Sequence, residues 1–208
     1  MSPTKSRDGH AGGATNLSAS PSQALQWLWD YLSNVPHPHV LDCGPVYQSN
    51  LDVLLKRGAK VYVAGLTTPL QQKEPRLWLQ TEKTRVFRTD EFLAQIPPIP
   101  LESLSVVLSW QLFDLVPHEA LAAVVGRLCS YLQPGGVLFC ILREPRLATG
   151  AETRWCFEGL TGLGFEGGKP TPFAYAPITN REMERLVPGG NVKTFLTRSG
   201  LREVLGVK

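Results

Sequence analysis

The sequence lacks any hydrophobic run long enough to cross a membrane. Apolar stretches such as Val137 to Leu142 are far shorter than the roughly 20 residues that a transmembrane helix needs. Residues 1–23 also lack the apolar segment of a secretory signal peptide. We therefore expect a cytoplasmic protein that makes no contact with a membrane.

Paired cysteines and a strong excess of one charge are also missing. The four cysteines are Cys43, Cys129, Cys140 and Cys156, and no two of them form a C-x-x-C pair. Reduced, buried thiols are the expected form, and this form suits a cytosolic compartment. Lys and Arg number 21 against 18 Asp and Glu, which gives a net charge of +3. Since nucleic-acid-binding proteins show a more pronounced basic patch, nucleic acid is not an expected partner.

Several motifs of catalysis are absent as well. The chain has no Walker-type glycine-lysine motif and no G-x-S-x-G motif, which argues against nucleoside triphosphate binding and serine hydrolysis. His37 and His39 lie two residues apart in a proline-rich connector. Solvated histidines are expected in such a connector, and no metal site is predicted.

Two regions of the chain differ in composition. Residues 1–20 are rich in Ser, Gly, Ala and Thr without a hydrophobic period, which predicts a flexible N-terminal tail. Residues 21–208 form the expected single domain, in which apolar runs alternate with helical patterns. The strand-like apolar runs are 39–44, 60–64, 85–88, 104–110 and 137–142. This alternation predicts an α/β fold with a mostly parallel sheet and helices on both faces.

The end of the domain breaks the alternation. Residues 191–198 and 201–207 flank Ser199-Gly200, a pattern that predicts a β-hairpin. The segment 143–177 is rich in Gly and Pro and carries five aromatic side chains. Three roles remain open for these aromatics: walls around a substrate, a separate small core above the sheet, or a surface for a protein partner.

Three features together indicate a family. A short apolar strand ends in Asp42-Cys43-Gly44, residues 132–136 read Leu-Gln-Pro-Gly-Gly before another apolar strand, and the chain closes on the hairpin. In this combination, residues 22–208 resemble the class I S-adenosylmethionine-dependent methyltransferases. The resemblance implies a Rossmann-like sheet of seven strands in the order 3-2-1-4-5-7-6, with only strand seven antiparallel. It also implies S-adenosylmethionine as cofactor and methyl transfer to an acceptor that the sequence does not identify.

The family's cofactor motifs are only partly present. The first motif, Asp-x-Gly-x-Gly-x-Gly, keeps Gly44 but has Val46 and Gln48 at its second and third glycine positions. Gly65 stands where the family places an acid that binds the ribose of the cofactor. Loss of the glycine conformation and of a charged hydrogen bond predicts weaker binding by about 3–4 kcal/mol, or several hundredfold.

The resemblance assigns cofactor contacts to a defined set of residues. They are Asp42, Gly44, Gly65, Asp90 and Trp110. Two of these have an alternative structural role. Asp90 either contacts adenine or caps a helix over residues 91–93, and Trp110 either stacks on a ligand or packs against a neighbouring helix.

The candidate catalytic residue is Asp114, which follows the strand that ends at Trp110. Its carboxylate is placed to orient or deprotonate a nucleophile. Its alternative role is structural, as part of the loop or the helix start before Pro117 and His118. Methyl transfer needs an open cavity between Gly44, Gly65 and Trp110.

A second function remains open, that of a non-catalytic relative without cofactor binding. This relative would act as an interaction or regulatory subunit through the segment 143–177. It predicts that Val46, Tyr47 and Gln48 fill the cofactor cavity and that segment 143–177 exposes apolar surface.

Overall fold

The computed structural model describes residues 20–150, 153–167 and 170–208. The tail expected at residues 1–20 lies outside this part of the chain, except for Ser20, which belongs to the short strand β1 (Ser20–Pro21). None of the described helices has the length and apolar character needed to span a bilayer. All four cysteines are buried and unpaired, as expected.

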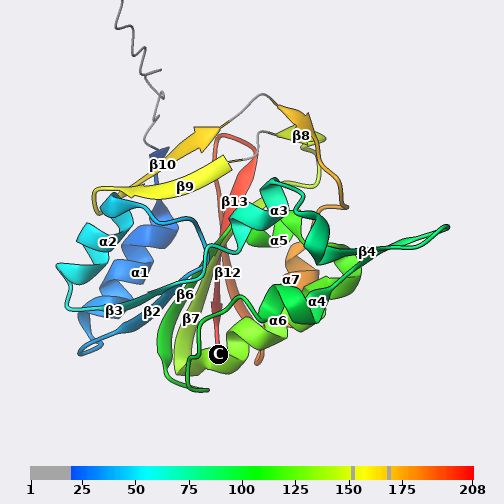
Figure 1. The fold of residues 1–208 in the computed structure, drawn as a ribbon. Coiled ribbons are helices and arrows are strands. Elements are labelled where there is room, and N and C mark those ends of the chain that lie inside the picture. The colour runs from blue at the N-terminus through cyan, green and yellow to red at the C-terminus, as the bar shows by residue number, and fades with distance from the viewer. Residues whose placement is uncertain (1–19, 151–152, 168–169) are drawn as a thin grey trace, which may run out of the picture.

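The centre of the molecule is a six-stranded sheet (Figure 1). Its strands, in spatial order, are β12 (Asn191–Leu196), β13 (Leu201–Val207), β7 (Leu132–Arg143), β6 (Leu104–Trp110), β2 (His39–Asp42) and β3 (Lys60–Val63). The pairs between β7, β6, β2 and β3 are parallel, whereas β13 is antiparallel to both of its neighbours. This arrangement confirms the α/β class, the mostly parallel sheet and the closing antiparallel hairpin.

The sheet has six strands in the described residues, one fewer than the seven expected. The missing third strand corresponds to β5 (Arg85–Phe87), which pairs instead with β4 (Trp78–Gln80) in a separate antiparallel ribbon. Figure 1 shows this ribbon projecting from the body of the molecule. Only Phe87 of the three β5 residues is buried. A strand covered on both faces needs consecutive apolar residues, and β5 does not supply them.

Helices cover both faces of the sheet, as predicted. On one face lie α1 (Gln23–Ser33) and α2 (Gln48–Leu55), and on the other α4 (Thr89–Leu93), α6 (His118–Tyr131) and α7 (Asn180–Leu186) (Figure 1). Successive residues of β7 alternate between the two cores. Phe139 packs with the α1 side, whereas Leu138 and Cys140 pack with the α6 side. This alternation explains why β7 reads as one continuous apolar run.

The segment after β7 forms a cover above one edge of the sheet. It contains β8 (Thr149–Gly150), β9 (Thr153–Glu158), β10 (Gly162–Gly167) and β11 (Thr171–Pro172). β10 pairs with both β9 and β1, so the chain just before α1 is fastened to the cover. Since Phe157 of β9 packs on Trp110, the last residue of β6, the cover lies at the carboxyl edge of the parallel strands. Ligands of open α/β sheets bind at this edge.

One buried carboxyl group connects the first helix to the last strand. Glu203 of β13 accepts hydrogen bonds through Oε2 from the Ser22 hydroxyl at 2.7 Å and from the Ala24 amide at 3.2 Å. Burial raises the pKa of Glu203 above its ordinary value of 4.5, and these two donors oppose that effect only in part. Folding therefore favours the protonated form of this side chain.

The stability contributed by this protonation is present below pH 4.5 and is lost as the pH rises through the raised pKa of the folded state. We expect the free energy of unfolding of the wild type to fall relative to Glu203→Gln across that range, by about 1.4 kcal/mol per unit of pKa difference. Urea unfolding of both proteins at a series of pH values measures this difference in unfolding free energy. Asp42 and Asp114 titrate in both proteins, so the difference isolates Glu203. A difference that does not change with pH would contradict the prediction.

Candidate functional site

Asp42, the last residue of β2, is at the centre of a buried hydrogen-bond network. Its Oδ1 accepts from the Gly44 amide at 2.8 Å and from Trp110 Nε1 at 2.6 Å, and its Oδ2 accepts from Asn50 Nδ2 at 3.0 Å. Asp42 is 2% exposed. Burial raises its pKa, and the three donors oppose the rise. Both carboxylate oxygens are thus bonded to the protein's own groups.

Trp110 lies directly against Gly44. A Cβ atom added to Gly44 would come within 2.9 Å of Cδ1 and Nε1 of the Trp110 indole. Trp110 is 1% exposed, and its ring also packs on Phe139 and Phe157, with centroids 5.8 and 5.2 Å away. Its backbone has φ of 51°, a conformation that non-glycine residues rarely adopt. The indole thus packs, but against side chains of strands β7 and β9 and not against a neighbouring helix as the sequence suggested.

The cover is fastened to this network through Asn50 of α2. Asn50 Oδ1 accepts from the Phe157 amide at 2.8 Å, while its Nδ2 donates to Asp42. The Phe157 ring packs edge-on to Trp29 of α1 at 5.1 Å. A single buried amide side chain therefore connects the end of β2 to the β9–β10 hairpin. Asn50 could not be identified from the sequence, because a lone Asn in a helix gives no signal of such a role.

The loop after β2 does not fill the space between Gly44, Gly65 and Trp110 where the family binds its cofactor. Val46 is 69% exposed and Gln48 is also exposed. Tyr47 is partly buried, and its hydroxyl donates to Glu166 Oε2 at 3.0 Å. The expectation that these three side chains fill the cavity is therefore wrong. Tyr47 is the N-cap residue of α2, so the chain turns into the helix here and leaves Val46 and Gln48 on the surface.

The other predicted contacts separate into two places. Gly65 lies beside Gly44, because a Cβ atom on Gly65 would be 3.9 Å from the Gly44 carbonyl oxygen. Asp90 is exposed in the first turn of α4, which packs against α6 and the 3-10 helix η1 (Pro75–Leu77). A carboxylate there interacts favourably with the helix dipole. The structure thus groups Asp42, Gly44, Gly65 and Trp110 and leaves Asp90 apart.

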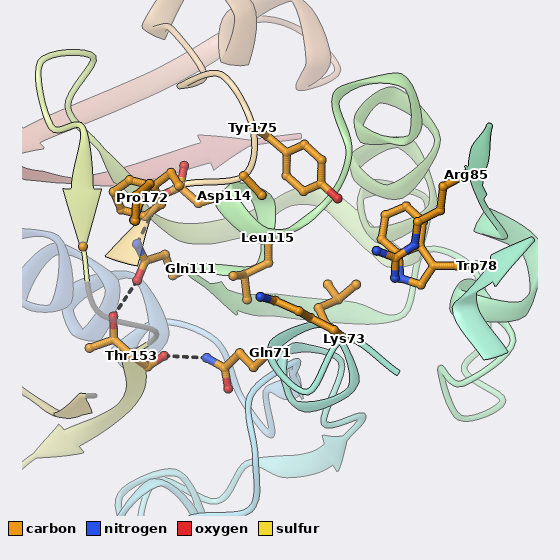
Figure 2. A pocket seen from close by; sticks show the side chains of 14 residues that line it. Gln71, Lys73, Trp78, Arg85, Gln111, Asp114, Leu115, Thr153, Pro172 and Tyr175 are labelled. Carbon is orange, nitrogen blue, oxygen red and sulfur yellow. Dashed lines mark hydrogen bonds between the residues drawn. The ribbon is translucent and has the colours of Figure 1, made fainter. Parts of the chain in front are cut away.

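A cavity of about 470 Å³ opens next to this group (Figure 2). Its walls come from α3 (Thr67–Gln71) and the turn after it, the β4–β5 ribbon, α5 (Leu112–Leu115), Gly150, Thr153 and residues 172–175. None of Asp42, Gly44, Gly65 and Trp110 is among the described residues that line this cavity.

Asp114 lies in the wall of this cavity and is 3% exposed. Its Oδ2 accepts from the Arg143 amide at 2.9 Å and from Gln111 Nε2 at 3.2 Å. Its Oδ1 has no hydrogen-bond partner in the described structure, and Arg143 Nε is 3.9 Å from it. Burial raises the pKa of Asp114, against the opposing influence of Arg143 and Gln111. Asp114 is therefore a residue of the short helix α5 that borders the cavity, while its side chain is fully enclosed beside Arg143.

The five aromatic side chains of segment 143–177 fall into two groups. Trp155 and Phe157 are buried, and Phe165 packs on Trp155 at 5.3 Å. These three belong to the core on the α1 side of the sheet and not to a separate small core. Phe173 and Tyr175 line the cavity instead. All five are buried or partly buried, so the exposed aromatic surface expected of a partner-binding segment is not seen here.

Two further features carry no ligand site. Residues 162–167 read Gly-Leu-Gly-Phe-Glu-Gly, the spacing of a dinucleotide-binding loop. They lie in strand β10 of a hairpin, whereas such a loop joins a strand to a helix. The described residues also hold no group of three or more His, Cys, Asp or Glu side chains arranged to bind a metal ion.

The sheet order and the closing antiparallel strand define a fold of the class I methyltransferase type. No known protein family and no curated protein matches the sequence. Among solved structures, the chain is similar to a 1,6-didemethyltoxoflavin-N1-methyltransferase from Burkholderia thailandensis, with 16% identity, coverage of 89% of this chain and 76% of that chain, and a TM-score of 0.49. It is also similar to an S-adenosylmethionine-dependent methyltransferase from Methanosarcina mazei, with 14% identity, coverage of 88% and 96%, and a TM-score of 0.47.

The close packing of Gly44 and Trp110 is testable by a glycine substitution. Gly44→Ala places a methyl group within 2.9 Å of the buried indole, and we expect a loss of about 1–3 kcal/mol in unfolding free energy. Gly126→Ala is the control, since a Cβ at this helical position meets nothing within 4 Å and is expected to stabilise by about 0.5–1 kcal/mol. Urea unfolding measures both, and a neutral Gly44→Ala would show that the indole is easily displaced.

The role of Asn50 is testable by hydrogen exchange. Asn50→Ala leaves Asp42 Oδ2 and the Phe157 amide without their partner, at an expected cost of about 2–4 kcal/mol. The Phe157 amide should then exchange faster than amides in β7. Gln48→Ala is the matched control, because this exposed side chain of the same helix bonds only to Asp52. Equal protection of Phe157 in both variants would exclude Asn50 as the fastener of the cover.

Proposed function

We propose that this chain is a non-catalytic protein of the methyltransferase fold, which acts by binding rather than by methyl transfer. The observation that supports this proposal most strongly is the contact between Trp110 and Gly44. In the family that the sequence resembles, the glycine backbone at this position approaches the cofactor. In this chain an indole ring occupies the space beside that glycine.

The residues around Gly44 do not fit S-adenosylmethionine in this arrangement. Asp42 uses both carboxylate oxygens on protein donors. Gly65 offers no carboxylate to a ribose, and Asp90 is an exposed residue in the first turn of α4. A charged hydrogen bond is worth about 1.5–3 kcal/mol, so these losses weaken binding even where a ligand displaces the indole.

In this proposal the protein binds its ligand or partner at the carboxyl edge of the parallel strands, where the β9–β10 cover lies. We include a cytoplasmic location in the proposal, since its cysteines are buried free thiols. The proposed contact of segment 143–177 with a partner is its exposed apolar side chain Leu160, at the turn between β9 and β10. The aromatic side chains of the segment, which are buried or partly buried, are not part of that contact.

A second candidate function is methyl transfer with S-adenosylmethionine to an acceptor not yet identified. One observation favours it: a cavity lies at the carboxyl edge of the sheet, and Asp114, the candidate catalytic residue, is among the residues that border it. This function requires Trp110 to leave its position against Gly44. The prediction of S-adenosylmethionine as cofactor depends on that movement.

Titration calorimetry with S-adenosylmethionine and S-adenosylhomocysteine distinguishes the two functions. We expect no heat and no thermal shift at millimolar ligand, because the replaced glycines and the missing acid already weaken binding several hundredfold and the indole adds a further loss. Binding at tens of micromolar or tighter would overturn the proposal and make methyl transfer the leading function.

The variant Trp110→Ala, checked for folding by circular dichroism, identifies the cause of a negative result. If the variant gains measurable binding, the indole beside Gly44 is what prevents S-adenosylmethionine from binding to the wild type. If it does not, the missing ribose acid is sufficient to prevent binding.

A further inference from the structure

One edge of the main sheet has no strand beside it. β3 pairs with β2 on one side and, in the part of the chain that the structure describes, with no strand on the other. The strand order of the family places a third strand there, but β5, which corresponds to it, lies in the β4–β5 ribbon. Figure 1 shows this ribbon projecting away from β3. The position next to β3 is therefore free to accept a strand from another chain.

The backbone of β3 presents hydrogen-bonding groups along this edge. The amides of Lys60 and Ala64 donate to carbonyl oxygens on the β2 side, both at 2.9 Å. Successive backbone groups of a strand point to opposite sides, so the N–H and C=O groups of Val61 and Val63 point to the open edge. No other strand of the described residues pairs with them. An edge of this kind is a template for strand pairing.

The side chains of β3 are also less buried than those of the neighbouring strands. The last three residues of β2 and all seven of β6 are buried, whereas β3 has one exposed residue, Lys60, and three partly buried ones. Val61 packs with the core on the α1 side, and Tyr62 packs with the core on the α6 side. Both faces of the sheet thus end in an apolar side chain that is only partly covered. A strand added beside β3 would bury more of both.

The charges around this edge have one sign. Residues 53–73, which run from α2 through β3 and α3, contain Lys56, Arg57, Lys60 and Lys73 and no Asp or Glu. None of these four side chains forms an ion pair within the described structure. Lys56 is the C-cap residue of α2, which packs against β3, and Lys60 is the first residue of β3. Like charges disfavour a second copy of this chain as the added strand and favour an acidic partner.

We propose that the β3 edge binds an extended, acidic segment of a partner protein, which joins the main sheet as its seventh strand. The backbone of the segment pairs with Val61 and Val63, and its acidic side chains lie near Lys56 and Lys60. In strand addition the main-chain hydrogen bonds supply affinity, and the side chains supply specificity. The proposed function does not include this surface, so the inference goes beyond it and does not depend on it.

Hydrogen exchange of the full chain with a synthetic peptide tests strand addition. The probe is the blocked peptide Glu-Asp-Val-Thr-Val-Tyr-Glu-Asp, which has apolar and polar β-formers between acidic ends. A basic counterpart replaces each acid with Lys, and a second control replaces the central Thr with Pro, which cannot donate a ladder hydrogen bond. We expect the acidic peptide to slow exchange of the Val61 and Val63 amides by about tenfold or more and the controls to leave it unchanged. This protection should shrink as salt is added.

A backbone variant tests the pairing itself. Val63→Pro removes an amide that points to the open edge and leaves the bonds to β2 intact, which a sheet edge tolerates. Val63→Ala is the matched control, because it shortens the side chain and keeps the amide. With folding of both checked by circular dichroism, we expect the Pro variant to bind the acidic peptide about tenfold more weakly than the Ala variant.

A charge variant provides a test that leaves the backbone unchanged. Lys60→Glu is expected to weaken binding of the acidic peptide by about tenfold. Lys83→Glu is the matched control, since it makes the same change at an exposed position in the turn of the β4–β5 ribbon. Equal weakening by both variants would mean that only the general charge of the protein attracts the peptide, and this would overturn the proposal.

Two further outcomes would overturn the proposal. One is that neither amide of the β3 edge is protected by the acidic peptide at millimolar concentration. The other is protection of the same amides that rises with the concentration of the chain alone, together with a dimer in sedimentation, because a second copy would then occupy the edge. The titration with S-adenosylmethionine does not involve β3 pairing, so its outcome leaves this proposal unchanged.

Discussion

The structure of the sheet edge depends on the carboxyl group of Asp42. This one side chain collects hydrogen bonds from the loop after β2, from the end of β6 and from α2. Burying a carboxyl group is costly unless its oxygens are bonded, and the three donors meet that requirement. In the family that the chain resembles, an acid at this position lies beside the cofactor. Here the same acid positions an indole ring and, through Asn50, the β9–β10 cover.

Two consequences follow for the edge of the sheet. Trp110, held by Asp42, joins Phe139 and Phe157 in a packed aromatic group above Gly44. The nearby cavity is bordered by α5 and the β4–β5 ribbon. Because β5 lies in that ribbon and not in the main sheet, a segment expected in the sheet contributes to the wall of the cavity.

The main sheet could be predicted from the sequence because its strands are nearly continuous apolar runs. The 137–142 run and the hairpin around Ser199-Gly200 specify their own structure locally. The ribbon could not be predicted, since the charged and apolar residues of 85–88 suit a sheet edge and a free hairpin equally well. The position of the hydrogen-bonded Asp42 was predicted, but its partner Asn50 was not.

The cavity was predicted only in part for a related reason. Asp114 was identified from its place after a strand, because the carboxyl ends of parallel strands form the ligand edge in this class of fold. Lys73, Arg85 and Tyr175 come from a turn, a ribbon and an irregular segment. Tertiary packing alone brings these residues together, so no short-range pattern in the sequence predicts that they lie around one cavity.

The position of β13 has a consequence for the order in which the chain folds. β13 is the last strand along the chain, yet it lies inside the sheet between β7 and β12. Its Glu203 also caps the start of α1 at Ser22, a contact between residues 181 positions apart. Contacts so distant in sequence form late and slow the folding of a domain. Completion of the sheet and fixing of its first helix therefore wait for the same late-arriving strand.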